Sequence, residues 1–207
     1  MNERIRGKCP RLYFVGVGGQ GTLTATRILA EAALLAGLEV VSGEVHGMAQ
    51  RGGVVESCLL LGGWRSPRVA PGEADIVLGF EPLETLRAAP YLAPGGAVFS
   101  SLDPIPPLSV CVGDEEYPDI EDIMAKAHKK ADYSHFMSCN ALGKQAGSQK
   151  YGPTALLGAV CASGLTPISI EYLGRAISQV FRGKTAEANL AAMKLGAKSV
   201  PYPVKNL

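Results

Sequence analysis

The sequence has 207 residues, 47% of them hydrophobic, which is enough to bury the core of one globular domain spanning residues 1–207. Its 20 lysines and arginines nearly balance its 19 aspartates and glutamates, so no overall positive field favours nucleic acid or an anionic membrane. Residues 1–10 are polar and basic, which predicts a flexible tail rather than a secretory signal. No apolar run reaches the roughly 18 residues that span a bilayer, and we expect a cytoplasmic protein.

Strands and helices alternate over the first half of the chain. The apolar run at residues 11–17 is typical of a buried parallel strand and ends at a glycine cluster. Strong helix formers follow over residues 22–38, with Gly37 as the expected stop. Further strands are predicted at 39–45, 54–61 (able to form a hairpin with 64–69), 74–80 and 97–101, and a helix at 83–92.

The second half of the chain is predicted to be mainly helical. Prolines crowd residues 102–118, which indicates an irregular connection around a short strand at 108–112. Helical order resumes near residue 120, and three later helices each follow a residue able to start or cap them. These helices are predicted at 154–163, 169–181 and 186–195. The predicted fold is α/β, with a Rossmann-like, mainly parallel sheet flanked by helices and a C-terminal helical layer.

A glycine-rich motif, G-x-G-x-x-G, stands between the first predicted strand and the first helix. Glycines allow a tight turn and close approach of a ligand, and the free N–H groups at a helix start attract phosphate. The alternative is that the glycines only let strand and helix pack closely, with no ligand bound. The candidate residues for backbone contacts with a cofactor are Gly16, Gly18, Gly19, Gln20 and Gly21.

A second polar segment, residues 46–53, follows the second predicted strand. It places His46, Gln50 and Arg51 among glycines that permit unusual backbone angles. Ligands bind at the carboxyl ends of parallel strands, so these side chains should face the same crevice as the glycine motif. We take the three as candidates for catalytic or interface contacts. Each could instead serve a structural hydrogen bond or a surface ion pair.

The five cysteines are widely scattered, and no two have the close C-x-x-C spacing usual in zinc or iron–sulfur sites. We expect free thiols in a reducing compartment and no metal site in this chain. Cys58 and Cys161 lie within apolar segments and are predicted to be small buried hydrophobes.

The motifs together resemble one family. GVGGQG after the first strand, EVHGMAQRGG after the second and ADIVLGFEPLETLRAAPYL further on are similar to the gamma domain of 2-oxoacid:ferredoxin oxidoreductases. YGPTALLGA and KTAEANL extend the resemblance to the closing helices, so that it covers nearly the whole chain. The segment EVHGMAQRGG most resembles the beta subunit of indolepyruvate ferredoxin oxidoreductases.

The resemblance implies a reaction in which an arylpyruvate, as the 2-oxoacid substrate, is decarboxylated on thiamine diphosphate. Electrons then pass through iron–sulfur clusters to ferredoxin, and coenzyme A takes the acyl group. This chain has no cysteine set for a cluster, and Gly113-Asp114 continues to Glu115 rather than to the Gly-Asp-Gly of a thiamine diphosphate site. The resemblance therefore places both cofactors in an alpha subunit, without which this chain is inactive.

Three roles remain for this chain within that family. It can close the active site against water, pair with the alpha subunit, and cradle coenzyme A with the glycine motif and Arg51. An isolated chain that exposes its apolar partner surface could also form a homodimer.

Two alternatives stay open at the level of sequence. One is a stand-alone oxidoreductase domain that binds NAD or FAD through Gly16, Gly18 and Gly21, with Glu44 holding the ribose. The other is a purely structural or regulatory interaction module whose glycine motif is empty. It predicts that changes at His46, Gln50 or Arg51 weaken assembly without changing turnover.

Overall fold

The computed structural model describes residues 9–46 and 53–201. Within them the sheet has six strands in the order β2-β3-β1-β4-β5-β6. Only β3 runs against its neighbours, because it pairs antiparallel with both β1 and β2 while the remaining neighbours pair parallel. The prediction of a mainly parallel sheet is confirmed. The strands are β1 (Arg11–Val17), β2 (Val40–His46), β3 (Val54–Leu61), β4 (Ala74–Gly79), β5 (Leu92–Ser101) and β6 (Tyr133–Met137).

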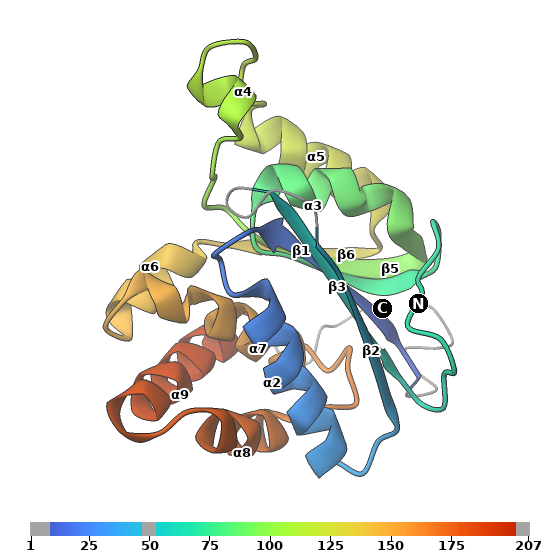
Figure 1. Ribbon diagram of the computed structural model, residues 1–207, viewed down its shortest axis with the longest axis vertical. Coiled ribbons are helices and arrows are strands. Elements are labelled where there is room, and N and C mark those ends of the chain that lie inside the picture. Colours follow the sequence, from blue (N-terminus) through green and yellow to red (C-terminus); the bar gives the residue numbers. More distant parts are fainter. Residues whose placement is uncertain (1–8, 47–52, 202–207) are drawn as a thin grey trace.

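Helices cover both faces of the sheet. Figure 1 shows α2, α7, α8 and α9 on one face and α3 with α5 on the other. None of the helices in the described ranges is long and apolar enough to cross a membrane. The helices are α2 (Thr22–Leu35), α3 (Pro82–Ala88), η1 (Ala89–Tyr91), α4 (Leu108–Cys111), α5 (Ile120–Lys130), α6 (Cys139–Gln145), η2 (Gln149–Tyr151), α7 (Gly152–Ala162), α8 (Ile170–Val180) and α9 (Gly183–Lys198).

The alternation of side chains along β1 builds the two layers of the core. Leu12 and Phe14 are fully buried in the cluster shared with α2 and the C-terminal helices, whereas Tyr13 and Val15 belong to the cluster on the α3 face. A strand buried on both faces favours apolar side chains on both, which is why residues 12–17 of this strand form a continuous apolar run. β1 therefore lies at the centre of the domain.

The predicted stop of the first helix is confirmed. α2 ends at Leu35, and Gly37 adopts φ 74°, in the left-handed region that favours glycine. The backbone N–H of Leu38 bonds to the carbonyl of Ala33 at 3.0 Å, and that of Gly37 bonds to Leu34, also at 3.0 Å. This pair of bonds satisfies carbonyls that the helix end would leave unpaired.

Three details of the sequence prediction are wrong. Residues 64–69 form no hairpin with β3, since both edges of β3 are already paired and Gly62 and Gly63, at φ 87° and 82°, turn the chain away. Residues 108–112 contain the short helix α4 rather than a strand, because their amides bond locally to Pro107 and Leu108. The edge strand β6 and the helix α6 were not predicted, since the sequence YSHFM lacks a clear apolar pattern.

The C-terminal helices pack unusually closely. A Cβ atom on Gly158 of α7 would lie 2.1 Å from the carbonyl oxygen of Met193 in α9. A Cβ on Gly196 of α9 would lie 1.8 Å from the carbonyl oxygen of Ala155 in α7. The two helix backbones are thus in direct contact, which only glycine permits at these positions.

Candidate functional site

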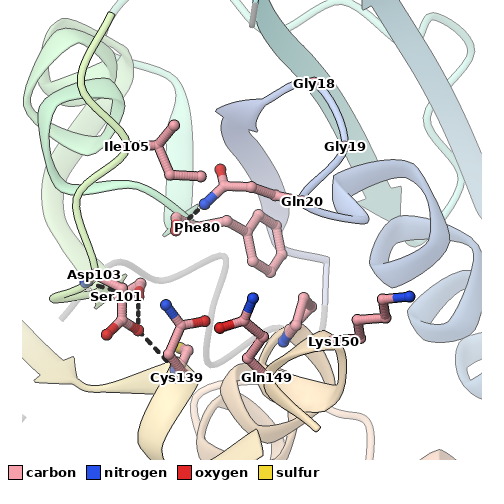
Figure 2. Close-up of a pocket in the computed structure, with 12 residues that line it drawn as sticks. Gly18, Gly19, Gln20, Phe80, Ser101, Asp103, Ile105, Cys139, Gln149 and Lys150 are labelled. Carbon is pink, nitrogen blue, oxygen red and sulfur yellow. Dashed lines mark hydrogen bonds between the residues drawn. The ribbon is translucent and has the colours of Figure 1, made fainter. Parts of the chain in front are cut away.

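A cavity of about 420 Å³ opens at the carboxyl ends of the parallel strands. This is the edge at which open α/β sheets bind ligands. Figure 2 shows the glycine turn above the cavity and the segments that follow β5 and β6 below it. The lining residues are Gly18, Gly19, Gln20, Phe80, Ser101, Asp103, Ile105, Cys139, Asn140, Gln149, Lys150 and Pro153.

The glycine turn supplies backbone N–H groups to this edge. Gly19 and Gly21 adopt φ 96° and 85°, and Gly21 precedes α2 without a side-chain cap. The N–H of Gly18 bonds to the carbonyl of Gly53 at 2.9 Å, and that of Gln20 bonds to Val17 at 3.1 Å. Within the described ranges the N–H groups of Gly19 and Gly21 have no such partner. With the unpaired amides at the start of α2, they offer hydrogen-bond donors of the kind that suits an anion.

Gln20 stabilises the turn from within. Its Oε1 accepts a hydrogen bond from the N–H of Val17 at 2.7 Å, and its Nε2 donates to the carbonyl of Phe80 at 2.8 Å. The side chain therefore ties the end of β1 to the end of β4. Gly16 lies behind it, where an added Cβ would come within 2.8 Å of the Thr22 Oγ1 and 2.9 Å of the Gln20 Oε1.

Asp103 organises the opposite wall, and both of its carboxylate oxygens accept hydrogen bonds from neighbouring protein groups. Its Oδ1 accepts from the Ser138 hydroxyl at 2.9 Å, and its Oδ2 accepts from the Ser101 hydroxyl at 2.8 Å and from the N–H of Asn140 at 2.7 Å. The carboxylate thus occupies the start of α6 and joins it to the end of β5. Lys150, Asn140 and Gln149 add further polar side chains to the lining of the cavity.

The one thiol of the cavity is unsuited to nucleophilic chemistry. Cys139 is 5% exposed, and burial raises the pKa of its thiol to about 12. A thiol with that pKa stays protonated at neutral pH and is a weak nucleophile.

The described residues offer no site for a metal or cluster. All five cysteines are free, and the described part of the chain contains no group of three or more His, Cys, Asp or Glu side chains placed to hold a metal ion. Iron–sulfur ligation needs several cysteines together, so these residues do not fit a cluster.

Residues 11–199 match the family described as pyruvate ferredoxin/flavodoxin oxidoreductase. The chain belongs to this family. It is 37% identical over 185 residues to indolepyruvate oxidoreductase subunit IorB of Archaeoglobus fulgidus, covering 89% of this chain and 92% of the relative. It is 39% identical to the IorB of Thermococcus kodakarensis, covering 91% and 94% of the two chains.

The sequence identity is lower to a pyruvate/ketoisovalerate oxidoreductase subunit and to two proteins of known structure. The common gamma subunit of the pyruvate/ketoisovalerate oxidoreductases of Thermococcus litoralis is 28% identical, with 92% of this chain and 97% of that one covered. The fold matches a keto/oxoacid ferredoxin oxidoreductase gamma subunit from Geobacter sulfurreducens with a TM-score of 0.66 at 21% identity, covering 92% and 97%. It also matches 31% of a longer 2-oxoglutarate:ferredoxin oxidoreductase chain from Magnetococcus marinus, with a TM-score of 0.70, 19% identity and 93% of this chain covered.

The structure places the glycine-motif part of the predicted site at the cavity. Gly18, Gly19 and Gln20 line the cavity, and Gly21 lies just behind them at the start of α2. The backbone of His46 ends β2 opposite Val55, at the same edge as the glycine turn. The His46 side chain, Gln50 and Arg51 lie outside the described residues.

The strand order does not favour the NAD or FAD alternative. A dinucleotide site needs the acidic residue at the end of a strand adjacent to the glycine-bearing strand. Here β3 lies between β1 and β2, so Glu44 sits opposite Ser57, one strand further from the glycine turn than that geometry requires.

The lower wall of the cavity was not predicted from the sequence. It consists of Asp103, Asn140, Gln149 and Lys150. A signal was available for two of them. Asp103 and Asn140 closely follow the carboxyl ends of β5 and β6, where ligand-binding residues are expected in a parallel sheet. Lys150 and Gln149 had no comparable signal, because the tertiary packing of η2 against α6 and α7 brings them to the cavity.

Proposed function

We propose that this chain is the cluster-free subunit of an indolepyruvate-type 2-oxoacid:ferredoxin oxidoreductase. In that complex it supports coenzyme A-dependent oxidative decarboxylation of an arylpyruvate, with thiamine diphosphate and iron–sulfur clusters in a larger partner subunit. The observation that carries the proposal is the higher identity to the two IorB chains, 37% and 39%, than to the common gamma subunit, 28%. The described cysteines do not fit a cluster, so the electron-transfer chemistry is assigned to the partner.

The contribution of this chain is a binding wall for the anionic part of coenzyme A. The N–H groups of Gly19 and Gly21, which have no backbone partner among the described residues, suit phosphate oxygens together with the start of α2 and the Lys150 amine. Arg51 is proposed to join them from the segment after β2, and His46 and Gln50 to contact the substrate or the partner. Covering the active site in this way also keeps water from reactive intermediates.

The proposal is tested by co-expression of this chain with the large subunit of a candidate oxidoreductase. We expect indolepyruvate- and coenzyme A-dependent reduction of ferredoxin only when both chains are present. Activity restricted to another 2-oxoacid would keep the subunit role and correct the substrate. A large subunit with full activity by itself would refute the role proposed here.

Replacing Lys150 with alanine in the assembled complex is expected to raise the KM for coenzyme A about tenfold, with little change in kcat. A charge-assisted hydrogen bond to phosphate contributes roughly 1.5–3 kcal/mol, which corresponds to a factor of about ten or more. The control is Lys144→Ala, an exposed lysine of the neighbouring α6 that does not line the cavity. Equal KM values in the two variants would remove Lys150 from the coenzyme A site.

Variants of the segment after β2 separate this role from a purely structural one. Changes at His46, Gln50 or Arg51 should alter turnover in complexes that still assemble, whereas an interaction module predicts weakened assembly alone.

We further propose a cytoplasmic location, since the five cysteines are free thiols suited to a reducing compartment.

A further inference from the structure

A short arm projects from the body of the domain between β5 and α5. Figure 1 shows its helix α4 at the far end of the molecule, away from the sheet and the C-terminal helices. No residue of α4 is buried, so packing against the core does not hold it in place. Local hydrogen bonds hold the helix in place instead. The N–H of Val112 donates to the carbonyl of Leu108 at 2.9 Å, and the Ser109 hydroxyl donates to the Glu115 carboxylate at 2.8 Å.

One buried carboxylate holds both ends of this arm. Glu81, only 1% exposed, accepts at Oε1 from the N–H of Ile105 at 3.1 Å and from the Tyr117 hydroxyl at 2.5 Å. Burial, with Glu81 beside it, raises the pKa of Tyr117, so the phenol remains a donor. The chain from 105 to 117 is therefore a loop closed at its base on a single side chain of the core.

The arm carries most of the exposed apolar bulk of the domain. Four large hydrophobic side chains are exposed among the described residues, and three of them lie on the arm: Ile105 at 41%, Leu108 at 77% and Val112 at 61%. Acidic residues flank this apolar tip, and residues 103–125 contain no lysine or arginine. The acidic residues of that stretch are Asp103, Asp114, Glu115, Glu116, Asp119, Glu121 and Asp122.

We propose that residues 105–117, the docking arm, insert into an apolar groove with a basic rim on the large partner subunit. An ordered loop that exposes apolar side chains gains free energy when they leave water, and the acidic flank selects a partner of opposite charge. The arm is also continuous with the candidate site, because Ile105 lines the same cavity as the glycine turn. Docking there would seat the partner beside the cavity. The inference rests on the proposed function, which supplies the partner.

Cys111 in α4 provides a native probe of this surface. It is exposed, whereas Cys58, Cys139 and Cys161 are buried, with thiol pKa values raised by burial. In the purified chain, maleimide should label Cys111 rapidly. In the complex with the large subunit we expect labelling at least tenfold slower, measured on the Cys111 peptide by mass spectrometry, with half-buried Cys9 as the internal reference.

Affinity for the large subunit gives an independent measurement. The double variant Leu108→Ser, Val112→Ser should weaken binding at least tenfold, and binding of the wild-type chain should weaken as salt is added. The matched control is Leu34→Ser, which changes the fourth exposed hydrophobic residue, 55% exposed on α2. The control should bind as the wild type does.

The outcomes distinguish this inference from the proposed function. An active complex in which Cys111 labels at the rate of the free chain, with unchanged affinity in the double variant, would overturn the docking arm and leave the proposed function intact. Protection of Cys111 that grows with the concentration of the chain alone would assign the arm to a second copy and overturn the proposal. Failure of any complex to form would overturn both.

Discussion

Replacing Gly196 with alanine is expected to lower the free energy of unfolding by about 2–3 kcal/mol, the usual cost of overpacking a tight contact. The new Cβ would stand 1.8 Å from the carbonyl oxygen of Ala155 and 2.5 Å from its carbonyl carbon. Both are backbone atoms of α7, so no side chain can rotate to make room, and α7 and α9 must separate. Urea unfolding of the purified chain, followed by circular dichroism, measures the difference.

Gly174→Ala is the matched control for this prediction. Gly174 is also helical and also near α9, but its added Cβ would meet only the ends of side chains, at 3.6 Å from Leu190 and 3.7 Å from Met193. Alanine is a better helix former than glycine, so this variant should gain about 0.5–1 kcal/mol. A similar gain in Gly196→Ala would show that the backbones of α7 and α9 are further apart than a 1.8 Å contact requires.

Replacing Glu81 with alanine should lower the free energy of unfolding by about 3 kcal/mol. Each hydrogen bond to a charged group contributes roughly 1.5–3 kcal/mol. The loss of a helix cap costs about 1 kcal/mol. The carboxylate accepts from the N–H of Glu84, which caps α3, and from the two ends of the docking arm at Ile105 and Tyr117. The net loss is smaller than the sum because the buried charge itself is costly. The same urea titration measures it.

Two further variants test the cause of that loss. Glu81→Gln keeps the shape and one acceptor oxygen, and should show an intermediate effect. Glu116→Ala removes an exposed acid of the docking arm and should change stability by no more than about 0.5 kcal/mol. If Glu81→Ala were as mild as Glu116→Ala, the carboxylate would not be what closes the base of the arm.

Much of the fold was predictable because local and global preferences agree. The apolar run of β1 and the stop at Gly37 were both predicted from short stretches of sequence and confirmed. A strand buried on both faces favours a continuous apolar run, and a left-handed helix end favours glycine, so each structural requirement leaves a short pattern in the sequence. Prediction failed where a segment has no clear pattern, as in the edge strand β6, or where an apolar run has no strand beside it, as in α4.

The sequence by itself determined the α/β class, the glycine turn between β1 and α2, and the resemblance that the family match confirmed. Only the tertiary structure decided that β3 lies between β1 and β2, which moves Glu44 away from the turn. It also decided that Lys150 and Asn140 face Gly19 across one cavity, and that Glu81 holds both ends of the docking arm. The physical reason is the range of the interactions. Strand propensity and turn chemistry act over a few residues, whereas strand order and cavity walls depend on contacts between residues far apart in the chain.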